Sequence, residues 1–183
     1  DLGEFNQCKS QLSELMPVPS AEFLAYTVLY NIAISDDSHQ SLLLHRLHGG
    51  EYASFLADPA VFHAVRVQSA VNRRDWLGYW KLAEAVPNLG GCILHKKVTP
   101  TMRLLALKSI CKAGAATTVQ LDFLTRQLGF KTDTDTSHYL EMVVGEEVIG
   151  SCYVDEKKEA EISSKMVYAA IRDKDVKSIE EDQ

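Results

Sequence analysis

The chain has 183 residues, which is enough for one domain or for two small modules that share a core, and it needs no disulfide or metal to be stable. Its hydrophobic fraction of 46% and charged fraction of 24% are those of an ordinary globular protein, and no apolar run approaches the roughly 20 residues of a membrane-spanning helix. The formal net charge of -6 conceals a basic middle, because residues 66–131 carry 11 bases and 3 acids, whereas residues 1–65 and 132–183 are both acidic.

The first part of the chain shows three amphipathic helical patterns with apolar side chains close to a period of 3.6. Ser20 is a typical N-cap for the second helix, and the glycine pair that begins at Gly49 is typical of the end of the third. Because the sequence begins at Asp1 inside the first pattern, we expect it to be a piece of a longer chain. We predict helices over residues 2–16, 20–36 and about 38–48.

Two further helices follow, each with a clear start signal. Asp58 followed by Pro59 indicates an N-cap and a proline at the first helical position, and Asp75 caps the next helix. We expect these helices to end near Asn72 and Val86. The apolar residues of the first are Val61, Phe62, Val65 and Val71. Helices of similar length that are joined by short loops, each with one apolar stripe, predict stacked antiparallel helical hairpins.

The pattern changes after Lys97, because shorter helices alternate with β-type residues. Thr99 and Pro100 indicate a helix start, Gly114 a helix end, and Gly129 the C-cap of the next helix. We predict helices over residues 100–113, 118–129 and 135–144, and then strands over residues 148–149, 151–154 and 160–163. Three short helices followed by a strand hairpin are typical of a winged helix.

The predicted fold is therefore mainly α, with stacked antiparallel helical hairpins followed by a C-terminal winged helix that carries a small β hairpin. We expect a helical-repeat part over residues 1–97, a winged-helix part over residues 98–168 and a polar acidic tail over residues 169–183.

Signals for catalysis are weak, so we predict no enzyme, catalytic residue, metal or cofactor. His45 and His48 lie three apart on a predicted helix, but no cysteine lies near them to complete a zinc site. Cys92 and His95 lie beside two lysines, which could activate a thiolate, but a packed cysteine next to a basic loop is the simpler interpretation. The four cysteines, Cys8, Cys92, Cys111 and Cys152, are expected to be reduced structural thiols.

Signals for binding are stronger, because the basic middle segment predicts a localised contact for a polyanion through phosphates rather than bases. The alternative is that these side chains only solvate the outer faces of helices. The predicted nucleic-acid contacts are Arg66, Arg73, Arg74, Lys81, Lys96, Lys97, Arg103, Lys108 and Lys112. We place Arg73 and Arg74 at a helix–helix turn, and Lys96 and Lys97 in a loop.

The third helix of the predicted winged helix is surrounded by acids, with no Lys or Arg between Lys131 and Lys157. Such a helix would repel a polyanion, so we expect it not to read a DNA groove and expect the winged helix to contact protein instead, for example by strand addition. The predicted protein-interface residues are Tyr139, Glu141, Tyr153, Val154 and Ile162.

Aromatic side chains gather at Trp76, Tyr79 and Trp80. Stacking on bases is one interpretation, but packing in the helical core is favoured, with Tyr79 off the main stripe and exposed.

Four sequence blocks resemble the GANP-type family of PCI-domain proteins, above all the leukocyte receptor cluster member eight group and its fungal mRNA-biogenesis relative. They begin with DLGEFNQC and QL at residues 1–12, continue with EF, AY, LY and I at residues 22–32, and end with matches over residues 102–113 and 119–130. The resemblance implies helical repeats capped by a winged helix, and a nuclear role in messenger RNA processing, transcription-coupled maturation or export. It also implies a second PCI-domain protein as partner, a small acidic DSS/Sem-type peptide on the assembly, and binding of RNA or DNA.

The leading hypothesis is therefore a nuclear scaffold that heterodimerises with another PCI protein and binds RNA or DNA through a basic surface, with no membrane partner. The alternative is an assembly subunit of a proteasome-lid, signalosome or initiation-factor type of complex, with the same architecture and no binding of nucleic acid. A salt-dependent binding assay distinguishes the two hypotheses.

Overall fold

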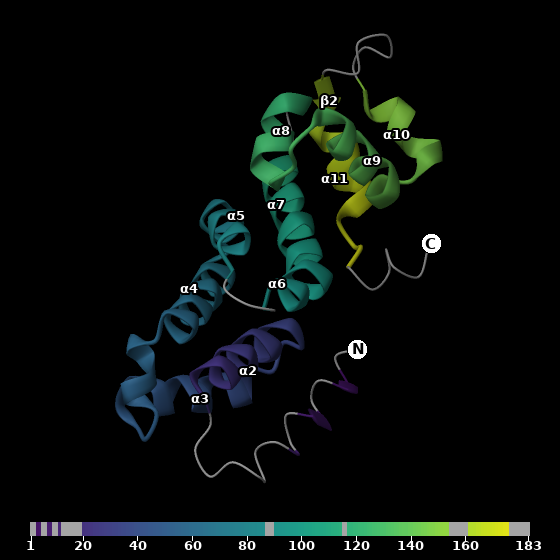
Figure 1. Ribbon diagram of the computed structural model, residues 1–183. Coiled ribbons are helices and arrows are strands. Elements are labelled where there is room, and N and C mark those ends of the chain that lie inside the picture. Colours follow the sequence, from purple (N-terminus) through teal and green to yellow (C-terminus); the bar gives the residue numbers. More distant parts are fainter. Residues whose placement is uncertain are drawn as a thin grey trace. The chain divides into compact units, whose positions relative to one another are not determined.

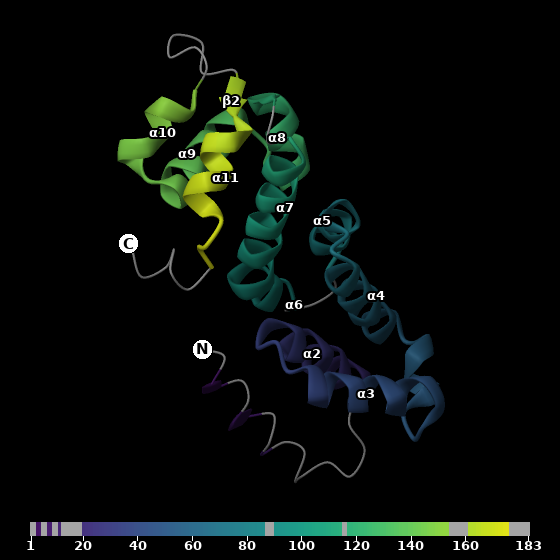
Figure 2. The same cartoon turned by 180° about the vertical axis from the view of Figure 1, so that it is seen from behind.

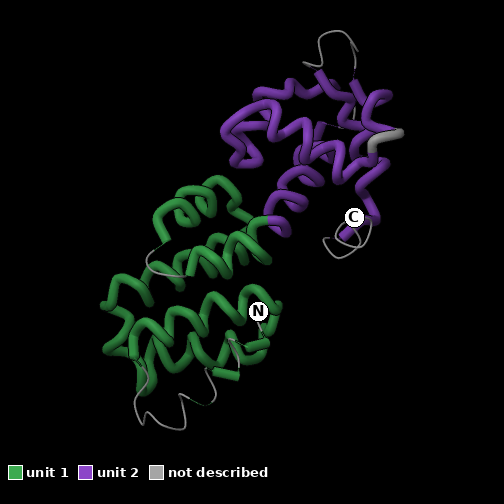
Figure 3. Tube along the Cα trace, turned by 45° about the vertical axis from the view of Figure 1, so that its right-hand side comes forward, with its two compact units in different colours: residues 1–99 green, residues 100–183 purple. Residues whose placement is uncertain are grey.

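The computed structural model describes residues 3–4, 7–8, 11, 20–86, 90–114, 117–153 and 161–175, apart from the side chains of Glu146 and Glu147. The chain divides into two compact units, unit 1 over residues 1–99 and unit 2 over residues 100–183 (Figure 3). No helix in the described ranges is both long and apolar enough to cross a membrane.

Unit 1 is helical in its described part (Figure 1). Its elements are α2 (Ala21–Ala33), α3 (Asp37–Gly49), the 3-10 helix η1 (Ala53–Ala57), α4 (Pro59–Arg73), α5 (Trp76–Glu84), α6 (Gly90–Ile93) and the π-helical turn η2 (Leu94–Val98). Most of the predicted helix over residues 2–16 lies outside the described residues.

The helix starts in unit 1 are fixed by local hydrogen bonds. The side chains of Ser20, Asp58 and Asp75 each accept a hydrogen bond from a backbone N–H in the first turn of α2, α4 and α5, at 3.3, 2.8 and 2.9 Å. Each bond satisfies a donor that a helix start leaves unpaired. The predicted N-caps of these three helices are confirmed.

The core of unit 1 lies where α2 packs along α4, with α3, α5, α6 and η2 completing it (Figure 2). The side chains of Val28, Leu47, Val61, Ala64 and Val67 are fully buried there. In α4 the buried positions fall at spacings of three and four, so one stripe of the helix faces α2 and the other faces solvent.

Helix α5 ends at Glu84, close to the predicted end near Val86. The predicted cap at Thr99 is wrong, because residues 90–113 form one uninterrupted helical run. Thr99 has helical angles, φ -58 and ψ -48, and its backbone N–H bonds to the carbonyl of Leu94, a π-type bond. Pro100 has no N–H to donate, so the series of backbone hydrogen bonds along the helix is interrupted there. The wider π turn directly before Pro100 accommodates this interruption. The Thr99 hydroxyl instead bonds to the hydroxyl of Tyr79 in the core, at 2.9 Å.

Unit 2 combines helices with a small sheet (Figure 1). Its elements are α7 (Thr99–Ala113, which starts at the unit boundary), β1 (Thr118–Gln120), α8 (Leu121–Leu128), α9 (Asp133–Val144), α10 (Glu146–Cys152), β2 (Glu161–Ser163) and α11 (Ser164–Ile171). β1 and β2 pair antiparallel with Val119 opposite Ile162, and Tyr153 forms an isolated bridge to Ile162 on its other side.

Two predictions about the strands of unit 2 are wrong. Residues 148–152 belong to helix α10, in which Ile149 and Cys152, three residues apart, are both buried while Val148 is exposed. A spacing of three places both side chains on the same face of a helix. Gly145, with φ +104, permits the sharp turn from α9 into α10. Residues 118–120, predicted as the start of a helix, form strand β1 instead.

The chain is thus mainly helical with a small antiparallel sheet, as expected. In unit 2, helix α7, strand β1, helices α8 and α9 and strand β2 follow one another in the order expected for a winged helix. Helix α10, between α9 and β2, is an addition to that order. The predicted wing, which carries Val154, Lys157 and Lys158, lies outside the described residues, so the winged helix itself stays a prediction. The predicted acidic tail over residues 169–183 begins inside helix α11 (Ser164–Ile171), where Ile171 is buried, and residues 176–183 lie outside the described residues.

Candidate nucleic-acid interface

Helix α4 carries two of the predicted phosphate contacts on its solvent-facing side. Arg66 and Arg73 are exposed and lie seven residues apart, which places them on the same face of the helix. The residues between them that face α2, Val67 and Ala70, are buried. Packing against α2 therefore fixes the side of α4 from which both side chains project.

The turn between α4 and α5 adds a third arginine. Arg74 is the C-cap of α4 in the left-handed conformation, with φ +56, and its backbone N–H bonds to the carbonyls of Ala70 and Val71. Arg73 and Arg74 lie at the negative end of the helix dipole, which favours cations there. Both side chains are exposed, as the sequence-based placement at a turn requires.

Lys96 and Lys97 do not lie in a loop, contrary to the sequence-based expectation. They lie in the π turn η2, between the buried residues Leu94 and Val98, and both are exposed. The alternation of burial in this turn follows from its helical geometry, since the apolar side chains face α2.

Several of the cations have no internal counter-charge. Within the ranges that the structure describes, no carboxylate lies within 4.0 Å of the charged groups of Arg66, Arg73, Arg74, Lys81, Lys96 or Lys112. By contrast, Arg46 pairs with Glu51 at 3.5 Å, and Arg126 pairs with Asp122 at 3.2 Å. The unpaired cations are available to an external anion.

Arg103 and Lys108, also predicted as phosphate contacts, have partners inside unit 2. The Arg103 guanidinium lies 3.9 Å from the ring centre of Phe130, and its Nε donates to the carbonyl of Leu128 at 3.2 Å. Lys108 Nζ donates to the carbonyls of Arg172 and Lys174. Both side chains therefore hold α7 to other elements, and we leave them out of the candidate interface.

The predicted protein-interface residues are divided between core and surface. Tyr139 and Ile162 are buried inside unit 2, at 8% and 1% exposure, because α9 and β2 both pack inwards there. Burial raises the pKa of the Tyr139 hydroxyl. Glu141 and Tyr153 are half-buried. Val154 lies outside the described residues, so within this predicted set only Glu141 and Tyr153 are described with part of their surface exposed.

The acids of α9 are mostly engaged locally. Asp133 accepts a hydrogen bond from the Thr125 hydroxyl at 2.6 Å, and Asp135 accepts one from the Thr132 hydroxyl at 2.8 Å. These contacts join the start of α9 to α8 and cap the helix. Their carboxylates keep this end of α9 negative.

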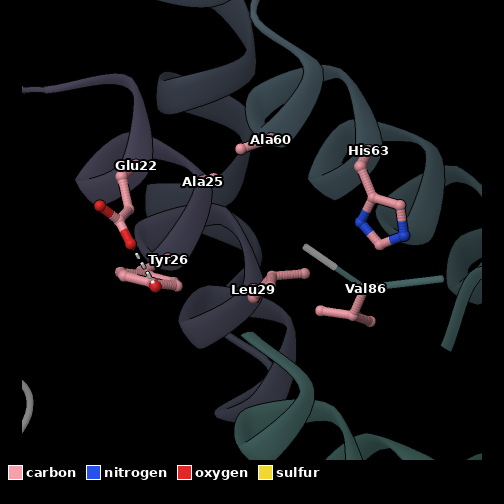
Figure 4. A pocket seen from close by; sticks show the side chains of 7 residues that line it. All are labelled: Glu22, Ala25, Tyr26, Leu29, Ala60, His63 and Val86. Atoms are coloured by element: carbon pink, nitrogen blue, oxygen red, sulfur yellow. Dashed lines mark hydrogen bonds between the residues drawn. The ribbon is translucent and has the colours of Figure 1, made fainter. Parts of the chain in front are cut away.

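A small pocket in unit 1 lies between α2, α4 and the residues that follow α5 (Figure 4). Its empty space, part of which is open solvent, is about 220 Å³. Glu22 accepts a hydrogen bond from the Tyr26 hydroxyl at 2.7 Å, and His63 Nε2 donates to the carbonyl of Leu82 at 2.9 Å. The first bond lies within α2, and the second joins α4 to α5.

The candidate reactive residues differ in burial. No three His, Cys, Asp or Glu side chains there could hold a metal ion. Cys8 and Cys92 are exposed, in contrast to the packed positions expected for them, whereas Cys111 and Cys152 are buried. Burial, with a smaller effect of neighbouring Cys152, raises the pKa of the Cys111 thiol to about 12.

Two aromatic positions differ from the sequence-based expectation. Tyr79 is fully buried rather than exposed, because its hydroxyl reaches Thr99 and its ring packs edge-on against Trp80. Phe62, placed in the apolar stripe of α4 from its periodicity, is 53% exposed. The signal that could have found Phe62 is its spacing of four from Arg66, which places the ring on the basic face of the helix.

Comparison with known proteins agrees with the resemblance in sequence. The family model described as the SAC3/GANP family matches residues 5–145. The THP3 homolog of Schizosaccharomyces pombe is 31% identical over 143 residues, which cover 76% of this chain and 35% of that protein.

Two further relatives are more distant or much longer. SAC3 family protein A of Arabidopsis thaliana is 31% identical, and the match covers 71% of this chain and 13% of that protein. The leukocyte receptor cluster member 8 homolog of Xenopus laevis is 27% identical, and the match covers 76% of this chain and 17% of that protein. The chain thus spans about a third or less of the curated relatives it matches. Because the family model covers well over half of the residues, this chain belongs to the SAC3/GANP family.

Proposed function

We propose that this chain is a non-enzymatic scaffold module that acts in the nucleus, in messenger RNA processing, transcription-coupled maturation or export, and that binds RNA or DNA through the basic surface of unit 1. The observation that carries the proposal is the set of exposed cations without an internal counter-charge among the described residues of α4, α5 and η2: Arg66, Arg73, Arg74, Lys81 and Lys96. Lys97, which follows Lys96 in the sequence, is also exposed. Membership of the SAC3/GANP family and the resemblance to its mRNA-biogenesis branch support the cellular role.

Phosphate contacts explain why these cations remain unpaired. A chain with a net charge of -6 repels a polyanion at long range, so binding requires a local concentration of positive charge. At physiological ionic strength, charges beyond about 8 Å are largely screened, so carboxylates farther than that from the cations weaken such a contact only slightly.

Charge reversal tests the nucleic-acid surface. The variant Arg73→Glu/Arg74→Glu/Lys96→Glu/Lys97→Glu should lose most of its affinity for a labelled single-stranded RNA and for a duplex DNA, measured by fluorescence anisotropy over a salt series. For the unaltered chain, the affinity for the single strand should fall on a log–log plot with a slope of about -0.7 per phosphate contacted.

A matched control separates the surface from the net charge. The variant Arg46→Glu/Arg126→Glu/Lys165→Glu/Arg172→Glu changes the net charge equally at four cations outside the proposed surface, and it should keep most of the affinity. Equal losses in both variants would show that the site lies elsewhere. Failure of the unaltered chain to bind either nucleic acid would favour the assembly-subunit alternative.

For the protein partner, we propose that unit 2 provides the interface with a second PCI-domain protein, on which a small acidic peptide of DSS/Sem type could also dock. Helices α9, α10 and α11 pack together, and each exposes an apolar side chain: Met142 at 38%, Val148 at 42% and Met166 at 40%. On β2, Ile162 is paired on both sides, so strand addition would use the edge of β1 that faces away from β2.

Substitution of the exposed apolar residues tests this interface. The variant Met142→Glu/Val148→Glu should abolish co-purification with a co-expressed second PCI-domain protein of the same organism, because buried charge opposes association. Leu42→Glu, at an apolar position of unit 1 that is 51% exposed, is the control and should leave the complex intact. Loss of the complex only in the Leu42→Glu variant would place the interface on unit 1.

A further inference from the structure

The solvent-facing side of α4 combines an aromatic ring with two arginines. Phe62, Arg66 and Arg73 are separated by four and seven residues, so they share one face of the helix and extend over about 16 Å. All three are exposed, while Val61, Ala64 and Val67 on the opposite face are fully buried. The face is therefore defined by the packing of α4 against α2.

This face has no negative charge of its own, because the helix Pro59–Arg73 contains no Asp or Glu. The Arg66 guanidinium lies 5.9 Å from the centre of the Phe62 ring, a cation–π distance. Phe62 is 53% exposed, so about half of its side chain is open to a ligand beside the arginines.

We infer that the outer face of α4 is a stacking platform for single-stranded nucleic acid, with a base on the ring of Phe62 and backbone phosphates on Arg66 and Arg73. The inference rests on the proposed function. It adds that the nucleic acid is single-stranded and that one of its bases stacks on an aromatic side chain. Single strands are commonly bound by aromatic side chains beside cations, since every base presents a face for stacking. Bases within a duplex are already stacked and cannot reach the ring.

Charge complementarity selects this occupant over an apolar protein surface. A protein hot spot would require a larger desolvated apolar area around Phe62, whereas its neighbours on this face, Arg66, Ser69 and Arg73, are polar. An acidic peptide would satisfy the arginines but would leave the face of the ring without a partner of matching shape.

Unit 2 provides an internal comparison. Phe123 on α8 is also exposed, at 40%, and Arg126 lies three residues after it, but the Arg126 guanidinium is bound to Asp122 at 3.2 Å. The neutralised arginine leaves that phenylalanine without a cation for phosphates, so Phe123 serves as a matched control.

The test measures the affinity of the whole chain for labelled oligouridine and for a duplex DNA by fluorescence anisotropy at one low salt concentration. Phe62→Leu should weaken binding of the single strand roughly fivefold or more, because stacking is lost while the apolar character remains. It should leave duplex binding unchanged. Phe62→Trp should restore or strengthen single-strand binding, and Phe123→Leu should bind like the unaltered chain.

A second measurement locates the contact directly. Ultraviolet cross-linking to oligouridine that carries 5-iodouridine should label the peptide that contains Phe62, and circular dichroism should show the same helix content for all variants. Unaltered binding by Phe62→Leu, while charge reversal of Arg73, Arg74, Lys96 and Lys97 still abolishes it, would overturn the platform and leave the proposed function standing.

Two other results would also overturn the inference. No binding of any nucleic acid by the unaltered chain would reject the proposed function and the platform together. Tighter binding of polyglutamate than of oligouridine, with the same loss in Phe62→Leu, would assign the face to an acidic peptide.

Discussion

Arginine side chains in this chain serve two different physical roles at the scale of single residues. Arg103 is half-buried, stacks on Phe130 and donates to a backbone carbonyl, so it belongs to the structure of unit 2. Arg66 is exposed, lies farther from its ring and has no carboxylate partner among the described residues. The sequence presents both as cations next to an apolar stripe, and only their partners distinguish them.

Alanine substitution should separate these two roles. Arg103→Ala should lower the free energy of unfolding by about 1–3 kcal/mol, because a close cation–π contact and hydrogen bonds are lost. Arg66→Ala should change it by less than about 0.5 kcal/mol, as at most exposed positions, but should weaken binding of RNA. Urea unfolding followed by circular dichroism measures the first effect. Equal stability of the two variants would contradict the structural role of Arg103.

At the scale of single elements, start signals in the sequence determine where helices begin. Asp58 supplies a side-chain acceptor and Pro59 a preset backbone angle, so the start of α4 depends on residues 58–60 alone. The run over residues 90–113 shows the opposite case, because a Thr–Pro pair that normally starts a helix lies inside one. There the hydroxyl of Thr99 bonds to the distant Tyr79, and the π turn accommodates Pro100.

Removal of the cap of α4 should be measurable as a loss of stability. Asp58→Ala should lower the free energy of unfolding by about 0.5–2 kcal/mol, because the N–H of Ala60 loses its acceptor. The control Asp37→Ala removes the same side chain from the first turn of α3, where Asp36 is the cap, and should cost only a few tenths of a kcal/mol. Urea denaturation at neutral pH measures both variants. An equal cost for the two would show that helix charge, not capping, stabilises α4.

At the scale of the whole molecule, the basic middle of the sequence does not form one uniform group of exposed cations. The basic segment, residues 66–131, contributes to both units, and its cations differ in their surroundings. Those on α4 and η2 are exposed, whereas Arg103, Lys108 and Arg126 are held by other groups of unit 2. A count of charges along the chain therefore overstates the surface available to an anion.

The sequence by itself was sufficient for the family, for the mainly helical fold and for most helix boundaries. Capping residues such as Ser20, Asp58 and Asp75 act within three residues, and an apolar period of 3.6 is visible in any helix. Gly129, with φ +69, ends α8 for an equally local steric reason. Such signals require no knowledge of distant parts of the chain.

Only the tertiary structure decided which side chains face a partner. The burial of Tyr79, the exposure of Phe62, the engagement of Arg103 and the helical state of residues 148–152 all depend on contacts between residues far apart in sequence. The pairing of Val119 with Ile162, 43 positions later, is of the same kind. A single sequence shows the period of a helix but not the element that covers it, because burial follows from packing between elements.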